Sequence, residues 1–276
     1  MSRLTDQVMA NLPSYPMTAE DWKEIQLMNT RPVPVLANPQ FEVPSDVRPT
    51  DLFAVHCNRC SVPGYRFIRK NNLRQMLMFV DGACLDNGSP NARAGWAVCV
   101  GPQTVVSGRL EPPAAQTSNR AELRSATIAL GLRVWKGEGF SSVMIASESE
   151  YVVKGYCEWL AAWKKSNWKT AKSADVLNKD LWEELDWRIH KLAREGVHVW
   201  FWRIPREWNE ADVYARQAAV SFPRCCRRPS SLMNMVRTKL RRSHDSWALK
   251  GYVKAYRFKC SEHLYCALFN INAFQI

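Results

Sequence analysis

Four acidic residues, widely separated in the chain, have the types and the local surroundings of ligands for a divalent metal ion. They are Asp81, Glu122, Glu148 and Asp212. Acids that meet at one edge of a sheet repel one another unless a cation lies between them. Carboxylate oxygens suit Mg²⁺ or Mn²⁺, and two such ions can activate water and stabilise the leaving oxygen in phosphodiester hydrolysis.

Each acid also has a purely structural alternative when it is considered alone. Asp81 ends a predicted strand and precedes a glycine, as a turn-initiating Asp does. Glu122 follows Asn119 by three residues, which is the spacing of a capping box. Glu148 and Asp212 lie near the predicted starts of helices, where acids offset the helix dipole. The metal-site hypothesis therefore depends on whether the fold brings the four acids together.

The hydrophobic periodicity predicts an α/β fold, with a mixed sheet of five strands flanked by helices. The strands are expected at Met76–Asp81, Gly95–Val100, Val105–Leu110, Ser142–Ala146 and Val197–Ile204. The helices are expected at Asn119–Val134, Ser149–Trp163, Lys179–Leu192 and Ala211–Ala219. In this order Asp81 and Glu148 both lie at strand ends, where α/β active sites tend to form.

Composition divides the chain into three parts. Residues 1–72 are rich in Pro and Asn, and we expect a largely irregular extension with one short helix near Ala19–Met28. Residues 73–221 carry the periodic pattern, and residues 222–276 form a basic tail without clean periodicity. Cys57 and Cys60 form a Cys-x-x-Cys pair, which is half of a zinc site, but free thiols are the simpler alternative.

The net charge of +12 suggests a polyanionic partner, but most of the excess lies in the tail. From Val220 onward eleven Lys and Arg are opposed by Asp245 and Glu262 alone, a local balance of +9. Basic tails are as often nonspecific as functional, so the charge says little about the central part.

We expect no membrane span, because no run of about 18 apolar residues occurs. The N-terminus also lacks the apolar core of a secretory signal. Nine cysteines, an odd number, favour a reducing, intracellular compartment. The nucleus or the cytoplasm is expected, and a mitochondrial location stays open.

From about Gln75 to Val220 the chain resembles the type 1 ribonuclease H family. Four segments in order carry the resemblance: Val80-Asp81-Gly82-Ala83-Cys84, Thr117-Ser118-Asn119-Arg120-Ala121-Glu122-Leu123, Ser149-Glu150-Tyr151-Val152-Val153-Lys154-Gly155 and Asn209-Glu210-Ala211-Asp212. The resemblance implies a ribonuclease H-like fold and a monomer that cleaves the RNA strand of RNA–DNA hybrids endonucleolytically. It also implies a two-metal mechanism with Mg²⁺, or Mn²⁺ as an alternative. The implied metal ligands and catalytic residues are Asp81, Glu122, Glu148 and Asp212.

A segment with interleaved Trp and Lys resembles the basic handle of the bacterial members. Between Lys154 and Ser173 five lysines are opposed by Glu158 alone, which suits a phosphate backbone and sugar faces. The alternative is a helix that buries Trp and solvates Lys, and we expect both, with Trp159 and Trp163 partly in the core. The substrate contacts implied by the resemblance and by this composition are Cys84, Asn87, Ser118, Asn119, Glu150, Trp159, Trp163, Lys164, Lys165, Trp168 and Lys169.

The chain departs from the family pattern at two places. Glu148 stands where the family has Asp, and a carboxylate misplaced by one methylene can cost about 10²-fold in rate. The loop before Asp212 has no histidine, whereas the family often carries one there. Its Arg206 and Glu207 resemble a Pro-Arg-Glu-x-Asn variant of the family. The alternative function is therefore a catalytically impaired domain that binds nucleic acid without cleavage.

Overall fold

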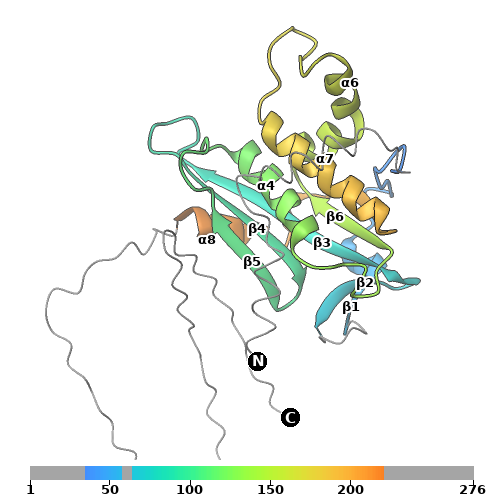
Figure 1. The fold of residues 1–276 in the computed structure, drawn as a ribbon. Coiled ribbons are helices and arrows are strands. Elements are labelled where there is room, and N and C mark those ends of the chain that lie inside the picture. The colour runs from blue at the N-terminus through green and yellow to red at the C-terminus, as the bar shows by residue number, and fades with distance from the viewer. Residues whose placement is uncertain (1–34, 58–63, 221–276) are drawn as a thin grey trace, which may run out of the picture. The chain divides into compact units, whose positions relative to one another are not determined.

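A long central strand, β3, organises the part of the chain that the computed structural model describes, residues 35–57 and 64–220. The strands are β1 Phe53–Cys57, β2 Tyr65–Arg69, β3 Asn72–Leu85, β4 Arg93–Gly101, β5 Thr104–Arg109, β6 Ser142–Ser147 and β7 His198–Arg203. Strand β3 pairs antiparallel with β2 and β4 and parallel with β6, which in turn pairs parallel with β7. The predicted mixed α/β sheet is therefore confirmed (Figure 1).

The sheet has seven strands rather than the expected five, because β1 and β2 form in residues that were expected to be irregular. Their apolar pattern is interrupted by Arg66, which is 4% exposed and pairs with Glu138 at 3.0 Å between Nε and Oε2. A buried arginine with its own carboxylate partner can sit inside a sheet, but it breaks the apolar alternation that predicts a strand.

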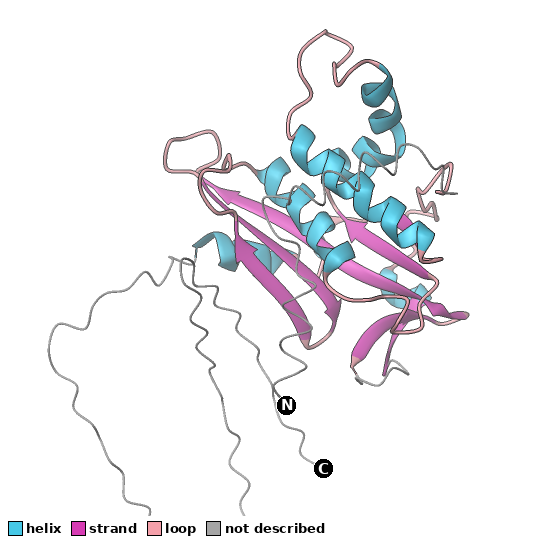
Figure 2. Ribbon diagram, viewed as in Figure 1, coloured by secondary structure: helices cyan, strands magenta, loops and turns pink. Residues whose placement is uncertain are grey.

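The helices and helical turns of the described residues are α3 Pro49–Leu52, α4 Ser118–Gly131, α5 Glu150–Lys154, the π-helical turn η1 Gly155–Trp159, α6 Leu160–Lys165, α7 Lys179–Arg194, the 3₁₀ turn η2 Arg206–Trp208 and α8 Asp212–Val220. Helices α4 and α7 lie together over one face of the sheet, and α8 packs against β3 and β4 (Figure 2). The helix predicted at Ser149–Trp163 is α5, η1 and the start of α6 in succession, so a π turn interrupts it.

Successive side chains of β3 point to opposite faces of the sheet, and each face has its own hydrophobic cluster. Met78 and Val80 pack in the cluster that contains Leu123 of α4. Leu77 and Phe79 pack in the cluster that contains Ala211 and Ala215 beside and within α8. Successive side chains of a strand point to opposite faces, so Asp81 continues the side of Leu77 and Phe79. The position of Asp81 in β3 thus directs it toward the start of α8.

Residues before β1 belong to this core. The Phe41 nitrogen donates to the Phe201 carbonyl at 2.7 Å, and the Phe201 nitrogen donates to the Pro39 carbonyl at 2.9 Å. These bonds cover an edge of β7, and the Phe41 ring packs edge-on against Trp202 with centroids 5.4 Å apart. The helix predicted near Ala19–Met28, the residue Cys60 and the basic tail lie outside the described residues. Within residues 35–57 and 64–220, no helix has both the length and the apolar character to cross a bilayer.

Candidate active site

Asp81 is the most deeply buried of the four acids. It lies inside β3, which continues to Leu85, and it is only 2% exposed. Its Oδ1 has no hydrogen-bond partner among the described residues. Burial raises the pKa of Asp81 to about 7, with the negative charges of Glu148, Asp212 and Glu122 adding to the effect. The fold therefore brings all four acids within electrostatic reach of one another.

Gly82 lets the helix that carries Glu122 approach Asp81. A Cβ at Gly82 would overlap the backbone nitrogen of Glu122, so a side chain there would push α4 away from β3. The N-cap of α4 is Thr117, whose Oγ1 accepts a hydrogen bond from the Arg120 nitrogen at 3.3 Å. The capping-box alternative for Glu122 is therefore wrong, because Glu122 lies beyond the third residue of the helix.

The Glu122 carboxylate is instead a half-buried group within the acid cluster. It accepts a hydrogen bond from the hydroxyl of Ser149, the residue that also caps α5 by accepting from the Val152 nitrogen at 3.2 Å. Burial raises the pKa of Glu122, and the hydrogen bond from Ser149 opposes this rise. Ser149 thus connects the start of α5 to the acid on α4.

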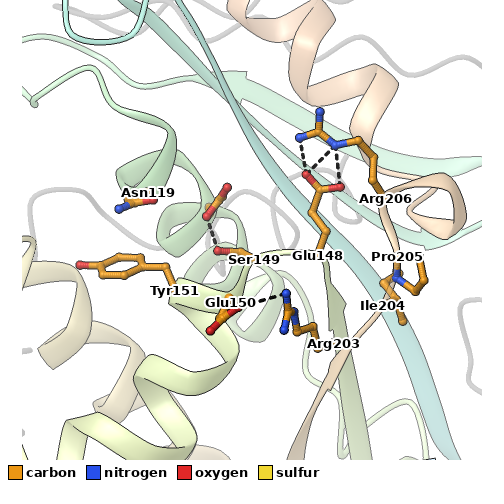
Figure 3. Close-up of a pocket in the computed structure, with 10 residues that line it drawn as sticks. Asn119, Glu148, Ser149, Glu150, Tyr151, Arg203, Ile204, Pro205 and Arg206 are labelled. Carbon is orange, nitrogen blue, oxygen red and sulfur yellow. Dashed lines mark hydrogen bonds and ion pairs between the residues drawn. The ribbon is translucent and has the colours of Figure 1, made fainter. Parts of the chain in front are cut away.

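Glu148 directly follows β6 and is engaged by an arginine from a different loop. The Arg206 Nε lies 2.9 Å from each of the two carboxylate oxygens of Glu148. The side chain of Glu148 is 13% exposed and that of Arg206 is 65% exposed. Figure 3 shows Arg206 pointing from its turn toward the Glu148 carboxylate.

Asp212 begins α8, and the preceding Asn209 fixes its place. The buried Asn209 amide donates to the Val80 carbonyl at 3.1 Å, and its oxygen accepts from the Ala211 nitrogen at 3.2 Å. Asp212 accepts hydrogen bonds from Arg216 at 2.7 and 3.1 Å, one turn along the same helix. Arg206 Nε also lies 3.9 Å from Asp212 Oδ1.

The four acids are not preassembled as a ligand set. Across residues 35–57 and 64–220, no group of three or more His, Cys, Asp and Glu side chains is close enough to hold a metal ion. Arg206 and Arg216 occupy the carboxylates of Glu148 and Asp212, but both arginine side chains are more than half exposed and can turn into solvent. The unpartnered Asp81 oxygen and the repulsion among four acids fit a divalent cation once these arginines move.

An open pocket of about 670 Å³ adjoins the acids (Figure 3). Its lining consists of Asn119, Glu122, Glu148, Ser149, Glu150, Tyr151, Arg203, Ile204, Pro205 and Arg206. The pocket joins two acids of the cluster to Asn119 and Glu150, two of the predicted substrate contacts. Glu150 is paired with Lys154 at 2.7 Å and with Arg203 at 3.1 Å.

Three further predicted substrate contacts lie outside the pocket lining. Cys84 is half-buried near the end of β3, and its Sγ lies 3.4 Å from the Gln116 carbonyl oxygen. Asn87 is exposed in the turn after β3, and Ser118 is the half-buried first residue of α4. Cys84 and Asn87 thus lie at and just after the end of β3, and Ser118 lies at the start of α4.

The predicted handle consists of α6 and the loop that leads to α7 (Figure 1). Trp163 packs against the buried Trp182 with ring centroids 5.5 Å apart, and Trp159 lies 5.8 Å from Trp163. Both residues are half-buried, and Trp163 packs against the core, so the expectation of a partly core position is confirmed for Trp163. Gly155 permits this packing, because a Cβ there would overlap the Trp182 ring.

The lysines of the handle are exposed, but two of them have acidic neighbours. Lys164 pairs with Asp186 at 2.7 Å, and Lys169 pairs with Asp175 at 2.6 Å. Lys165 is exposed at the end of α6. Exposed ion pairs contribute little free energy, so these lysines can exchange an acid for a phosphate. The half-buried Trp168 lies under Lys179, whose Nζ is 5.4 Å from the ring centroid.

Sequence patterns did not reveal the partners of the acids. Ser149, Arg206, Asn209 and Arg216 were not predicted as site residues. For Asn209 the signal was its place in the Asn-Glu-Ala-Asp segment, and for Arg206 it was the loop in which the family often has a histidine. No local pattern reports that Arg206 turns toward Glu148, because the two are 58 residues apart. His56 lies on β1, His190 on α7 and His198 on β7.

Residues 73–220 match the family model described as RNase H. Ribonuclease H of Treponema pallidum is 34% identical over 171 residues, covering 54% of this chain and 96% of that protein. Ribonuclease H1 of Mus musculus is 31% identical over 149 residues, covering 52% of this chain and 50% of that protein. The chain thus spans about half the length of this mammalian relative. The crystal structure of LC9-RNase H1, a type 1 RNase H with the type 2 active-site motif, is 29% identical and covers 53% of this chain and 72% of its own, with a TM-score of 0.37.

Proposed function

Because the chain belongs to the RNase H family, we propose that it hydrolyses the RNA strand of RNA–DNA hybrids as an endonuclease. The observation that carries the proposal is the buried Asp81, whose unpartnered oxygen lies in a cluster with three other acids. Each of these acids stands in a segment that resembles a family motif. Since one copy of the chain supplies all four, we propose that a monomer acts on the hybrid.

Asp81, Glu122, Glu148 and Asp212 would hold Mg²⁺ or Mn²⁺, with two ions as the family resemblance implies. The bound metal would supply Lewis-acid activation of water and neutralise charge on the scissile phosphate. Asp81 and Asp212 come from elements that Asn209 ties together, so they provide the rigid side of the site. Ser149 orients the Glu122 carboxylate from the other side.

The chain's own polar groups beside the acids would position the hybrid. Asn119 is exposed at the pocket, and Ser118 lies next to it at the start of α4. Amide and hydroxyl groups of this kind can bind ribose 2′-hydroxyls, which distinguish RNA from DNA in a duplex. The handle would add contacts to the phosphate backbone through Lys164, Lys165 and Lys169. Contacts to 2′-hydroxyls would favour a duplex that contains an RNA strand over double-stranded DNA.

A second candidate is binding without cleavage, and the contact between Glu148 and Arg206 favours it. An acid that stays paired with an arginine is withdrawn from metal ligation, and the loop of residues 204–209 supplies no histidine for proton transfer. In this case the domain would retain the handle and the pocket but lack a working metal site.

A substrate panel separates the two candidates. The full chain is incubated with end-labelled RNA–DNA hybrid, double-stranded RNA or double-stranded DNA of one sequence, with Mg²⁺ or Mn²⁺. The proposal predicts internal cuts in the RNA strand of the hybrid and none in the other duplexes. Retained hybrid binding without cuts at high protein concentration would favour the second candidate.

A further inference from the structure

Arg206 contacts two of the four acids in the cluster. Its Nε lies 2.9 Å from both oxygens of Glu148 and 3.9 Å from Asp212 Oδ1. Glu148, followed by Asp212 and Asp81, raises the pKa of Arg206. Burial raises the pKa of Glu122, and the Arg206 charge is among the groups that oppose this rise. One guanidinium therefore interacts with all four acids.

Arg206 differs in this respect from the other arginine at the site. Arg216 pairs with Asp212 one turn along the same helix, as an ordinary i,i+4 pair does. Arg206 belongs to the turn η2, and its contact reaches across to the residue that follows β6. A planar guanidinium that contacts both oxygens of one carboxylate leaves little of that carboxylate for a second cation.

We propose that Arg206 is an internal counter-ion that competes with the divalent metal for Glu148, so that metal binding displaces Arg206 into solvent. This inference rests on the metal site of the proposed function. The exposed guanidinium can leave without unpacking a core, because 65% of the side chain is already in solvent. The unpartnered Oδ1 of Asp81 marks where the displacing cation would gain a further ligand.

The role of Glu148 follows from the same contact. Its side chain is one methylene longer than that of Asp, and the extra length extends the carboxylate toward the turn that carries Arg206. The pair would hold the cluster together without metal, since Arg206 offsets charge that otherwise repels Asp81 and Glu122. Arg206 is thus a positioning residue that sets how tightly the cluster takes up metal.

The test is Mn²⁺ binding measured by calorimetry on the full chain without nucleic acid. Arg206→Ala is compared with Arg203→Ala, a matched control in the same pocket whose arginine pairs with Glu150. Loss of a competing, bidentate contact should tighten Mn²⁺ binding about five- to tenfold in Arg206→Ala. Arg203→Ala should bind Mn²⁺ as the unmodified protein does, and Arg206→Lys should fall between the two.

Melting temperatures provide a second measurement. In the presence of a chelator, Arg206→Ala should melt below the unmodified protein, because the acids have lost a counter-ion. Saturating Mn²⁺ should raise the melting temperature of Arg206→Ala by more than it raises that of the unmodified protein. Equal or weaker Mn²⁺ binding by Arg206→Ala would overturn the competition while leaving the metal site in place. Absence of Mn²⁺ binding in every variant would instead overturn the metal site of the proposed function, and the competition with it.

Discussion

The side-chain amide of Asn209 donates a hydrogen bond of 3.1 Å to the carbonyl oxygen of Val80. Asp81 follows Val80 directly, and Asp212 lies three residues after Asn209. One buried contact therefore fixes the spacing between the first and the last acid of the cluster, although they are more than a hundred residues apart in the chain.

Replacing Asn209 with Leu should disrupt this spacing. The Val80 carbonyl would stay buried without its donor, and the free energy of unfolding should fall by about 1–3 kcal/mol. Hybrid cleavage should fall further than this loss explains, because Asp212 would no longer be held beside β3. Urea unfolding and single-turnover cleavage measure the two effects, with the exposed Asn91→Ala as the control. Full cleavage by a destabilised Asn209→Leu would show that Asn209 does not position Asp212.

Replacing Glu148 with Asp should increase cleavage. The shorter side chain would withdraw from Arg206 and match the length that the family pattern has at this position, so a gain of about tenfold or more in kcat is expected. Initial rates on a labelled hybrid at saturating Mg²⁺ provide the measurement, and Glu150→Asp serves as the control for shortening an acid in the same pocket. A rate for Glu148→Asp equal to or below that of the unmodified protein would contradict this account of Glu148.

Replacing Lys164, Lys165 and Lys169 together with Ala should weaken hybrid binding. If each lysine neutralises one phosphate, the slope of log K against log salt should become shallower by about 0.9 per lost contact. Filter binding from low to moderate salt gives both quantities. Lys70→Ala, in the turn between β2 and β3, is the control outside the handle. Unchanged affinity and an unchanged slope would show that the handle lysines do not contact the hybrid.

Replacing Phe41 with Ala should destabilise the domain, although Phe41 lies before the residues matched by the family model. Its ring contacts Trp202, and the Arg69 guanidinium lies 5.2 Å from the ring centroid. Truncation of a half-buried aromatic ring should lower the free energy of unfolding by about 2 kcal/mol. Urea denaturation measures this, and the exposed Leu73→Ala should change stability by less than about 0.5 kcal/mol. Equal stability of the two variants would mean that the Phe41 ring does not stabilise the domain.

Much of the fold could be predicted from the sequence, because its central elements have strong local patterns. The apolar run that ends at Asp81 predicts a strand, and the hydrophobic periodicity after Thr117 predicts a helix. Neither prediction needs information about the elements that pack against them. The two additional strands could not be found in this way. The polar Arg66 makes β2 resemble a loop, and only its distant partner Glu138 explains why an arginine is buried there.

The four acids could be predicted from their local segments, but their electrostatic environment could not. The hydrogen bond from Ser149 to Glu122 and the contact between Arg206 and Glu148 join residues that are 27 and 58 positions apart. Such contacts depend on how helices and loops meet over the sheet. The sequence could therefore predict which acids belong to the cluster, whereas their hydrogen-bond and ion-pair partners required the three-dimensional arrangement.

The most direct test of the proposed activity is hybrid cleavage by the unmodified protein and by Asp81→Asn, in parallel, with Mn²⁺ and with a chelator. Asn keeps the shape of Asp81 and removes a buried charge that its neighbours repel, so the variant should melt at the same or a higher temperature. We predict internal cuts in the RNA strand only with metal, and a loss of at least about 10²-fold in Asp81→Asn with hybrid binding retained. Equal cleavage by a folded Asp81→Asn, or no cleavage by the unmodified protein with metal, would contradict the account.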